Sequence, residues 1–258
     1  MRTEIEESNR HLREAWKLYA RVSLGGEALD RNGLSFANAN QPWFFMNLGM
    51  LQGPAADESD LKHRAQETAK YFGTRGNPWV FAASEDWFGP NANAVLAGVG
   101  LVHKLDLMGM VAERLSPPTR TFPDVRLRRI DDEETRFALA DLNADAYEVP
   151  REWGRQALGN VALWQTPLFG TIAYVREEPA SGCFALPIDE ALYVGWVATA
   201  KSHRRLGLAE LVMRRSLEDA KKATGFERTV LHATNDGRPV YLRMGYKSVI
   251  KFPFYSPA

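Results

Sequence analysis

The stretch Val197-Ala-Thr-Ala-Lys-Ser-His-Arg-Arg-Leu-Gly-Leu-Ala209 decides the fold of this chain of 258 residues. It leads from a strand pattern, through a basic turn that contains Gly207, into an amphipathic helix. The first turn of a helix has unpaired backbone N–H groups and a positive dipole end, so a pyrophosphate docks there favourably. Gly207 and Ala209 leave room for that approach. Arg204 and Arg205 either both add charge-assisted bonds to phosphate, or one of them points into solvent.

The residues on either side predict a meander of strands followed by a long helix. Strands are expected over Gly170–Arg176, Gly182–Pro187 and Ala191–Thr199, with the turn-forming sequences Glu-Pro-Ala-Ser-Gly and Ile-Asp-Glu between them. From Leu206 to Thr224, apolar and charged residues alternate near the helical period, and Gly225 ends the pattern. The meander is expected to be antiparallel.

Further elements complete a mixed α/β layer structure. Val125–Ile130 alternates apolar and basic residues like a strand with one buried face. Asp131 or Asp132 is a favoured N-cap for a helix over Glu133–Tyr147. After the long helix we expect a strand over 228–233, a short helix over 237–244 and a last strand over 245–254.

A proline-rich segment, Leu115–Pro123, divides the chain into near halves, 1–119 and 120–258. Its three prolines resist incorporation into a helix or a central strand. The first half repeats the order helix, strand, short helix, glycine, strand. This order predicts a duplicated fold, and the alternative is a generic α/β helper domain. The elements concerned are Glu58–Phe72, closed by Gly73, then Trp79–Ala83, Ala92–Ala97, Gly100 and Leu101–Met110.

Composition excludes several classes of partner. Lys plus Arg and Asp plus Glu both total 32, so no net field attracts nucleic acid or an anionic membrane. The single cysteine, Cys183, permits no intrachain disulfide and no thiolate metal cluster, and we expect no metal. The first twenty residues are charged throughout, and no long apolar run occurs. We therefore expect a cytoplasmic protein that is neither secreted nor membrane-spanning.

Two motifs resemble those of a known family. Arg204-x-x-Gly207-x-Ala209 after a strand is similar to the acetyl-CoA pyrophosphate motif of the GNAT-type N-acetyltransferases. The downstream Leu231–Tyr246 looks like the family's second motif: a strand, an Asn, a short helix carrying Tyr, then Gly and an aromatic residue. The resemblance extends from Val125 to the C-terminus. It implies a GNAT-like acyl-CoA N-acyltransferase fold, with two such halves in tandem if the first half is a duplicate.

The resemblance also implies how acetyl-CoA binds. Two central strands, here Tyr193–Thr199 and Arg228–Ala233, would splay apart, and the pantetheine arm would bond to strand backbone in the gap, beside Val197. The pyrophosphate would lie on the backbone amides of Arg205, Leu206, Gly207, Leu208, Ala209 and Glu210.

Two further positions match the second motif. Tyr241 matches the tyrosine that protonates the departing CoA thiolate in many family members, and a phenol suits that step. The alternative is an aromatic residue that packs on Tyr246 and Phe252. Asn235 either bonds the cofactor or caps the short helix.

A general base is not evident. Family members often carry a Glu on the strand that corresponds to Ala191–Thr199, which here has no acid. Glu190, Asp189 and His232 are the available substitutes, although His232 also suits a satisfied, half-buried histidine. Trp196 either walls the acceptor pocket or belongs to the core.

The acceptor amine should be selected by the segment Ala144–Trp153. It mixes aromatic and acidic residues, as a cation-accepting mouth would, but it is equally an ordinary turn between helices. The residues concerned are Tyr147, Glu148, Glu152 and Trp153.

The first half departs from the family pattern. Its turn Met50–Glu58 lacks the Arg-x-x-Gly-x-Gly motif, and Pro54, Asp57 and Glu58 discourage a pyrophosphate. We expect a degenerate companion without its own acetyl-CoA site, which shapes the acceptor pocket or supports contacts in a homodimer. Leu96 precedes Gly100 by four residues, as Tyr241 precedes Gly245, so the first half has a leucine where the second half has the tyrosine. The stretch of the first half that looks most like a pocket, or alternatively like core, contains Asn38, Asn40, Trp43 and Phe44.

Two functions follow from these patterns. The first is an enzyme that binds acetyl-CoA and a primary amine in a ternary complex, with direct attack on the thioester and Tyr241 as general acid. No covalent intermediate is expected, and Cys183 is not a candidate nucleophile. The second is an acyl-CoA sensor, which the missing strand base supports and the tyrosine at position 241 argues against.

Overall fold

The computed structural model describes residues 3–258, which form two compact units. Of the described residues, unit 1 comprises 3–109, 232–235 and 248–258, and unit 2 comprises 110–231 and 236–247. The units thus differ from the two continuous segments, 1–119 and 120–258, that the proline-rich linker predicts. No helix among the described residues has the length and apolar character needed to cross a bilayer.

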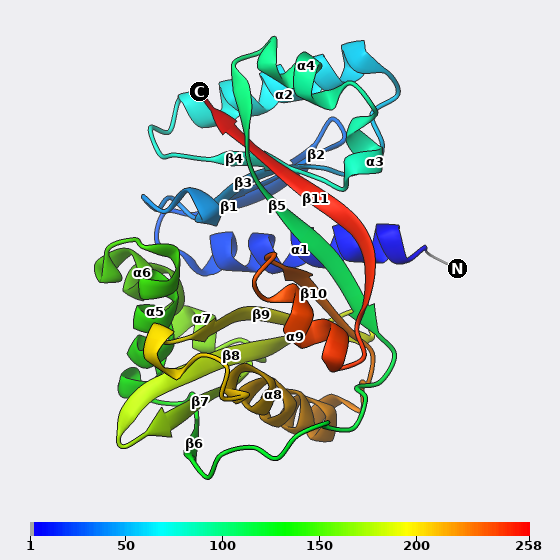
Figure 1. The fold of residues 1–258 in the computed structure, drawn as a ribbon. Coiled ribbons are helices and arrows are strands. Elements are labelled where there is room, and N and C mark those ends of the chain that lie inside the picture. Colours follow the sequence, from blue (N-terminus) through cyan, green and yellow to red (C-terminus); the bar gives the residue numbers. More distant parts are fainter. Residues whose placement is uncertain (1–2) are drawn as a thin grey trace. The chain divides into compact units, whose positions relative to one another are not determined.

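Unit 1 contains a mixed sheet whose strand order is β1-β2-β3-β4-β11-β5 (Figure 1). β3 and β4 are parallel, whereas β1–β2, β2–β3 and β4–β11 are antiparallel. The helices α1 and α2 pack against β2. The elements are α1 (Glu4–Val22), β1 (Glu27–Arg31), β2 (Leu34–Asn38), η1 (Phe44–Met46), β3 (Asn47–Leu51), α2 (Glu58–Gly73), β4 (Val80–Ala82), α3 (Glu85–Phe88), α4 (Ala92–Ala97), β5 (Leu101–Ala112) and β11 (Lys247–Pro257).

The core of unit 1 is aromatic. Phe72 stacks on Trp79, with ring centroids 5.1 Å apart, and Phe81 contacts Phe88 edge to face. Trp43 is fully buried and therefore belongs to the core, which was one of its two predicted roles. Burial of such rings is the main apolar stabilisation of this unit.

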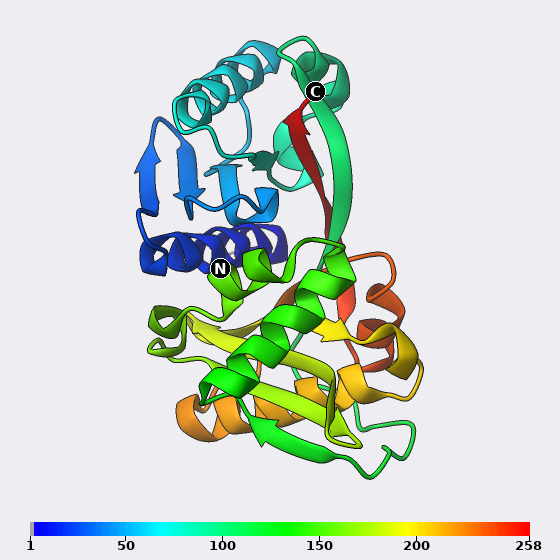
Figure 2. The same ribbon diagram turned by 90° about the vertical axis from the view of Figure 1, so that its left-hand side faces the viewer.

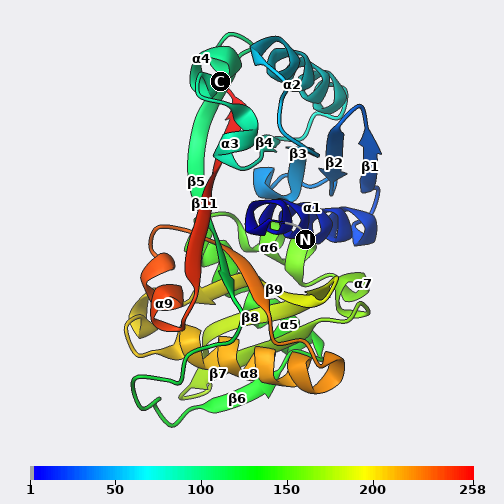
Figure 3. The same ribbon diagram turned by 90° about the vertical axis from the view of Figure 1, so that its right-hand side faces the viewer.

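Unit 2 has the strand order β10-β9-β8-β7-β6. β7 to β9 form the predicted antiparallel meander. β6 pairs antiparallel with β7, and β10 runs parallel to β9. The helix α5 covers one face of these strands and α8 the other (Figures 2 and 3). The elements are β6 (Arg126–Arg129), α5 (Glu133–Tyr147), α6 (Arg151–Leu158), α7 (Val161–Trp164), β7 (Phe169–Val175), β8 (Glu178–Ile188), β9 (Ala191–Thr199), η2 (Lys201–His203), α8 (Leu208–Thr224), β10 (Thr229–Ala233) and α9 (Arg238–Arg243).

Local signals set the ends of the two main helices of unit 2. Asp132, one of the two predicted caps, accepts a hydrogen bond from the Thr135 backbone N–H at 2.8 Å and begins α5. Gly225 ends α8 in the left-handed conformation, at φ 78°. α8 begins at Leu208 rather than at the predicted Leu206, because Gly207 is its left-handed N-cap residue.

One predicted turn is wrong. The sequence Glu-Pro-Ala-Ser-Gly at 178–182 lies inside strand β8. The turn is made by the preceding Arg176 and Glu177, both left-handed at φ 48° and 68°. Pro179 is tolerated in the strand next to a register shift between Ala173 and Tyr174 on β7.

The predicted order of elements occurs twice. In the first half β3, α2, β4, α4, Gly100 and β5 follow one another, and in the second half β9, α8, β10, α9, Gly245 and β11 do so. In each case the two strands that flank the long helix are parallel. Gly100 and Gly245 are both left-handed, at φ 78° and 97°.

Candidate active site

The turn between β9 and α8 leaves the N-terminus of α8 open. Gly207 adopts φ 84° and ψ 5°, a conformation that glycine reaches without a steric penalty. It is the N-cap residue, and no side chain caps the helix there. The first N–H groups of this 17-residue helix are therefore available to an anion.

Three arginines lie at or beside this turn. Arg204 and Arg205 are exposed, and neither makes a hydrogen bond or an ion pair within residues 3–258. Arg120, from the proline-rich linker, is likewise unpaired within that range, and its Cδ lies 3.2 Å from the position that a Cβ at Gly207 would take. Cations near the positive end of a helix dipole are unfavourable unless an anion joins them. Their arrangement therefore suits a phosphate group.

The other predicted pyrophosphate contacts fall on the same turn and on the start of α8. Leu206 is 48% exposed, whereas Leu208 is buried, and Ala209 is half-buried. The Glu210 carboxylate accepts two hydrogen bonds from Arg214, at 2.7 and 2.9 Å, which neutralises it. Because the Glu210 carboxylate is already paired with Arg214, it does not cancel the positive charge of the turn. These positions therefore offer backbone amides beside a positively charged turn.

β9 changes its pairing at the position predicted for the splay. Its parallel ladder with β10 consists of three pairs, from Leu192–Thr229 to Val194–Leu231. Beyond them, Trp196 and Val197 form a bulge opposite the single residue Cys183 of β8. Trp196 is left-handed at φ 57°. A bulge leaves backbone groups outside the regular ladder, and Val197, the predicted pantetheine neighbour, is half-buried there.

Tyr241 is the buried residue of α9, at 8% exposure. Its ring folds back over Gly237, where an added Cβ would lie 3.2 Å from the phenol oxygen. Burial raises the pKa of Tyr241, and the nearby Tyr147, Cys183 and Tyr246 raise it further. The phenol therefore keeps its proton at neutral pH. The ring also contacts Tyr246 edge to face, so its two predicted roles are not mutually exclusive.

The predicted acceptor segment lies at the end of α5. Tyr147 contacts Trp196 edge to face, with centroids 6.2 Å apart. Glu148 accepts a hydrogen bond from Lys201 at 3.0 Å, which ties this segment to the turn before α8. Asp145 is paired with Arg151, at 2.6 and 2.9 Å. The segment thus presents aromatic rings while these two carboxylates are already neutralised.

Two of the three candidate bases, Asp189 and Glu190, lie at the opposite end of β9 from the bulge. Asp189 and Glu190 form the turn before β9, so Glu190 is at most about 23 Å from Val197, seven residues on, at about 3.3 Å per residue. His232 belongs to unit 1, where its Nε2 lies 3.1 Å from the Ser8 hydroxyl oxygen. Burial and, to a smaller extent, the neighbouring His11 lower the pKa of His232 to about 3.

Two further predictions concern Asn235 and Cys183. Asn235 is exposed in the turn before α9 and does not cap that helix, because the N-cap residue is Gly237. Cys183 is fully buried, and burial raises the pKa of its thiol to about 12. A neutral, buried thiol is a poor nucleophile.

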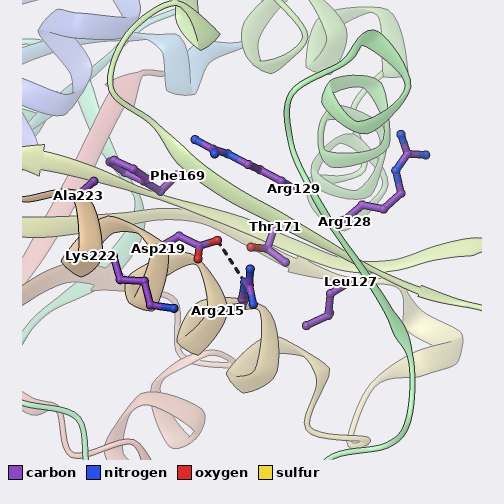
Figure 4. Close-up of a pocket in the computed structure, with 9 residues that line it drawn as sticks. All are labelled: Leu127, Arg128, Arg129, Phe169, Thr171, Arg215, Asp219, Lys222 and Ala223. Atoms are coloured by element: carbon purple, nitrogen blue, oxygen red, sulfur yellow. Dashed lines mark hydrogen bonds and ion pairs between the residues drawn. The ribbon is translucent and has the colours of Figure 1, made fainter.

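A separate cavity of about 510 Å³ lies between β6, β7 and the C-terminal half of α8 (Figure 4). It contains none of the predicted site residues, and its lining includes Arg128, Arg215, Asp219 and Lys222. Three of its four lining cations are paired: Arg128 with Asp132 and Glu134, Arg215 with Asp219, and Lys222 with Glu218. The fourth, Arg129, has no ion pair among the described residues. We assign no function to it.

The corresponding turn of the first half is closed. Asp57 caps α2 by accepting a hydrogen bond from the Asp60 backbone N–H at 2.8 Å. Leu96, the counterpart of Tyr241, is fully buried and has no ionisable group. A carboxylate at the helix N-terminus competes with any phosphate for the same N–H groups.

Sequence reasoning missed two residues of the site, Arg120 and Asn143. Arg120 lies in a linker, where no periodic pattern assigns it a neighbour. Asn143 was detectable as a polar residue on an otherwise apolar face of α5, whose neighbours Leu139, Ala140 and Leu142 are buried. The sequence could not show which group it bonds.

Comparison with known proteins agrees with this geometry. Residues 128–246 match the model of the acetyltransferase (GNAT) family. No curated protein matches the chain. The matched residues include the turn before α8, the β9 bulge and α9.

Solved structures share the fold over most of the chain. A GCN5-related N-acetyltransferase from Kribbella flavida is 18% identical, with a TM-score of 0.72, over 97% of this chain and 95% of that one. A functionally unknown conserved protein from Staphylococcus epidermidis is 11% identical, with a TM-score of 0.65, over 93% and 96%.

A tandem GNAT protein from the clavulanic acid biosynthesis pathway is 14% identical, with a TM-score of 0.54, over 88% and 80%. At such identities the likeness concerns the fold, which has the mixed α/β architecture of the GNAT proteins and is consistent with two halves. Residues 128–246 constitute a GNAT acetyltransferase domain.

Proposed function

We propose that the protein transfers an acetyl group from acetyl-CoA to an amine by direct attack in a ternary complex. The observation that carries the proposal is the open N-terminus of α8, with Gly207 left-handed and Arg204 and Arg205 unpaired within residues 3–258. Such a terminus offers N–H groups and positive charge to a pyrophosphate. The β9 bulge supplies backbone groups for the pantetheine arm.

Tyr241 is the proposed general acid. As the amine nitrogen bonds to the acyl carbon, the C–S bond breaks, its electron pair goes to sulfur, and the phenol gives that sulfur its proton. The nitrogen loses a proton to water, and water returns a proton to the phenolate, so that the phenol is regenerated. Burial keeps the phenol protonated, and its pKa is raised from the ordinary value of a tyrosine.

The acceptor enters beside the aromatic pair Tyr147 and Trp196. Their rings contact each other, and the neighbouring carboxylates Asp145 and Glu148 already have cationic partners. Cation–π contact and apolar packing are therefore the main forces available to an amine there.

We test the proposal by calorimetric titration with acetyl-CoA. The expected result is one site per chain, because Asp57 caps the equivalent helix of the first half. Gly207→Val should abolish binding, since a β-branched residue is strained at φ 84° and its Cβ would lie 3.2 Å from Arg120 Cδ, which disturbs the turn. Gly225→Val is the matched control: Gly225 is also left-handed, at φ 78°, ends the same helix and has no atom within 4 Å of an added Cβ.

The outcomes are distinct. Absence of binding to the wild-type protein would remove the proposed function. Two sites per chain would show that the first half also binds acetyl-CoA. Equal losses in Gly207→Val and Gly225→Val would mean that strain in α8, and not the turn, controls binding.

An acyl-CoA sensor is the second candidate. Its support is the absence of a carboxylate on β9, whose residues run Ala-Leu-Tyr-Val-Gly-Trp-Val-Ala-Thr. A sensor would bind acetyl-CoA with one site but release no free CoA thiol in the presence of a panel of primary amines. Thiol release that depends on the amine would exclude it.

A further inference from the structure

Asn143 is a fully buried amide on the face of α5 that covers the sheet. Its Nδ2 donates to the Leu139 carbonyl, one turn earlier, at 3.0 Å, and to the Trp196 carbonyl on β9 at 3.1 Å. Both partners are carbonyl oxygens, so the NH2 end must face them. The amide therefore joins the helix to the β9 bulge.

Trp196 is held in a strained conformation. Its φ of 57° is unusual for a bulky residue, and such strain costs about 1–3 kcal/mol. It persists where surrounding groups fix the backbone. The hydrogen bond from Asn143 to the carbonyl of this same residue provides that restraint.

Stability alone does not account for an amide at position 143. Its Oδ1 is buried without a hydrogen-bond partner among the described residues. An unsatisfied buried acceptor is costly, and an apolar side chain of similar size would avoid that cost. What the amide adds over an apolar side chain is the position that its nitrogen imposes on Trp196.

We propose that Asn143 is a positioning residue that holds the β9 bulge in the shape that receives the pantetheine arm of acetyl-CoA. The inference rests on the proposed function, because the bulge matters in this way only if acetyl-CoA binds there. Asn143 does not touch the reacting atoms; it fixes the backbone of Trp196 and Val197.

The first measurement is the affinity for acetyl-CoA. Asn143→Leu keeps the number and branching of the side-chain heavy atoms and removes both donors, and we expect a Kd raised about tenfold. In the acyl transfer assay, KM for acetyl-CoA should rise by about the same factor while kcat falls less. Asn143→Ala is the second variant if the leucine side chain impairs folding.

A double-mutant cycle with Trp196→Gly tests whether Asn143 acts on acetyl-CoA binding through the backbone of Trp196. Glycine adopts a left-handed conformation without strain, so the bulge no longer needs its restraint. In the Trp196→Gly background, Asn143→Leu should raise the Kd by less than about threefold. An equal effect in both backgrounds would overturn the inference.

Ser216→Ala is the matched control. Ser216 is also buried and donates to Thr171 at 3.0 Å, but it bonds no residue of β9. The affinity of the Ser216→Ala variant for acetyl-CoA should match that of the wild type. A wild-type protein that binds no acetyl-CoA would refute the proposed function, whereas an Asn143→Leu variant that binds as tightly as wild type would refute this inference alone.

Discussion

Burial determines which ionisable residues can exchange protons. It raises the pKa of Tyr241, so the phenol retains the hydrogen that a departing thiolate needs. It lowers the pKa of His232 to about 3, so that ring is neutral near pH 7 and a weak proton acceptor. We therefore expect water, and not His232, to take the proton of the amine.

Replacing Tyr241 by phenylalanine should lower kcat by about 10²-fold and leave the Kd for acetyl-CoA nearly unchanged. The reason is that the variant loses the proton donor but keeps the ring that packs on Tyr246. Steady-state kinetics and calorimetry measure the two effects. Tyr246→Phe is the control, since it removes a neighbouring buried hydroxyl and should retain the wild-type rate.

The dependence of kcat on pH provides a check on the same residue. Because the folded-state pKa of Tyr241 is raised, the phenol stays protonated as the pH passes its ordinary value near 10. The rate should therefore not fall in that range while the protein remains folded. A decline near pH 10 that disappears in Tyr241→Phe would contradict the pKa shift.

Among the elements, the linker between β5 and β6 supplies a cation to the start of α8. We expect Arg120→Ala to raise the Kd for acetyl-CoA about three- to tenfold, because one charge-assisted contact is lost. Binding should also become less sensitive to salt. The control is Arg114→Ala, which removes an exposed arginine paired with Glu227 at 2.5 Å. Equal affinities for Arg120→Ala and wild type would exclude the contact.

Local patterns predicted the elements that local forces determine. The bounds of α4, α5 and β9, and the end of α8, agree with the sequence because caps, glycines and periodicity act within a few residues. The turn at 178–182 was misplaced because Pro179 and Gly182 look more turn-forming than Arg176 and Glu177, which make it.

The same distinction between local and long-range signals applies to the candidate site. The open turn of α8 was predictable, since Gly207 and its arginines are consecutive in sequence. The bond from Asn143 to Trp196 spans 53 residues and has no local signal. The role of Tyr241 stays a prediction that Tyr241→Phe tests, and the roles of Glu190 and Asn235 also stay predictions.

For the molecule as a whole, the end of the chain belongs to the core of unit 1. Phe254 and Tyr255 pair with Ala82 and Phe81 of β4, and Tyr255 is 3% exposed. Tyr255→Ala should destabilise this unit by about 3 kcal/mol through loss of buried ring area. Hydrogen exchange at β4 should accelerate, while the affinity for acetyl-CoA stays unchanged.

Ser256→Ala is the control for that prediction, because Ser256 is half-buried and its hydroxyl bonds the backbone of the next residue. Unchanged exchange at β4 in Tyr255→Ala would show that β11 is not needed to hold this part of the sheet.

The pairing of β4 with β11 also bears on biosynthesis. A ribosome makes β1 to β5 early, but β11 leaves the exit tunnel after β6 to β10. The edge of β4 therefore stays unpaired until residues 247–257 have been translated. Unpaired strand edges pair readily with other chains. We therefore expect β4 to be the strand that a chaperone must protect for the longest time during synthesis.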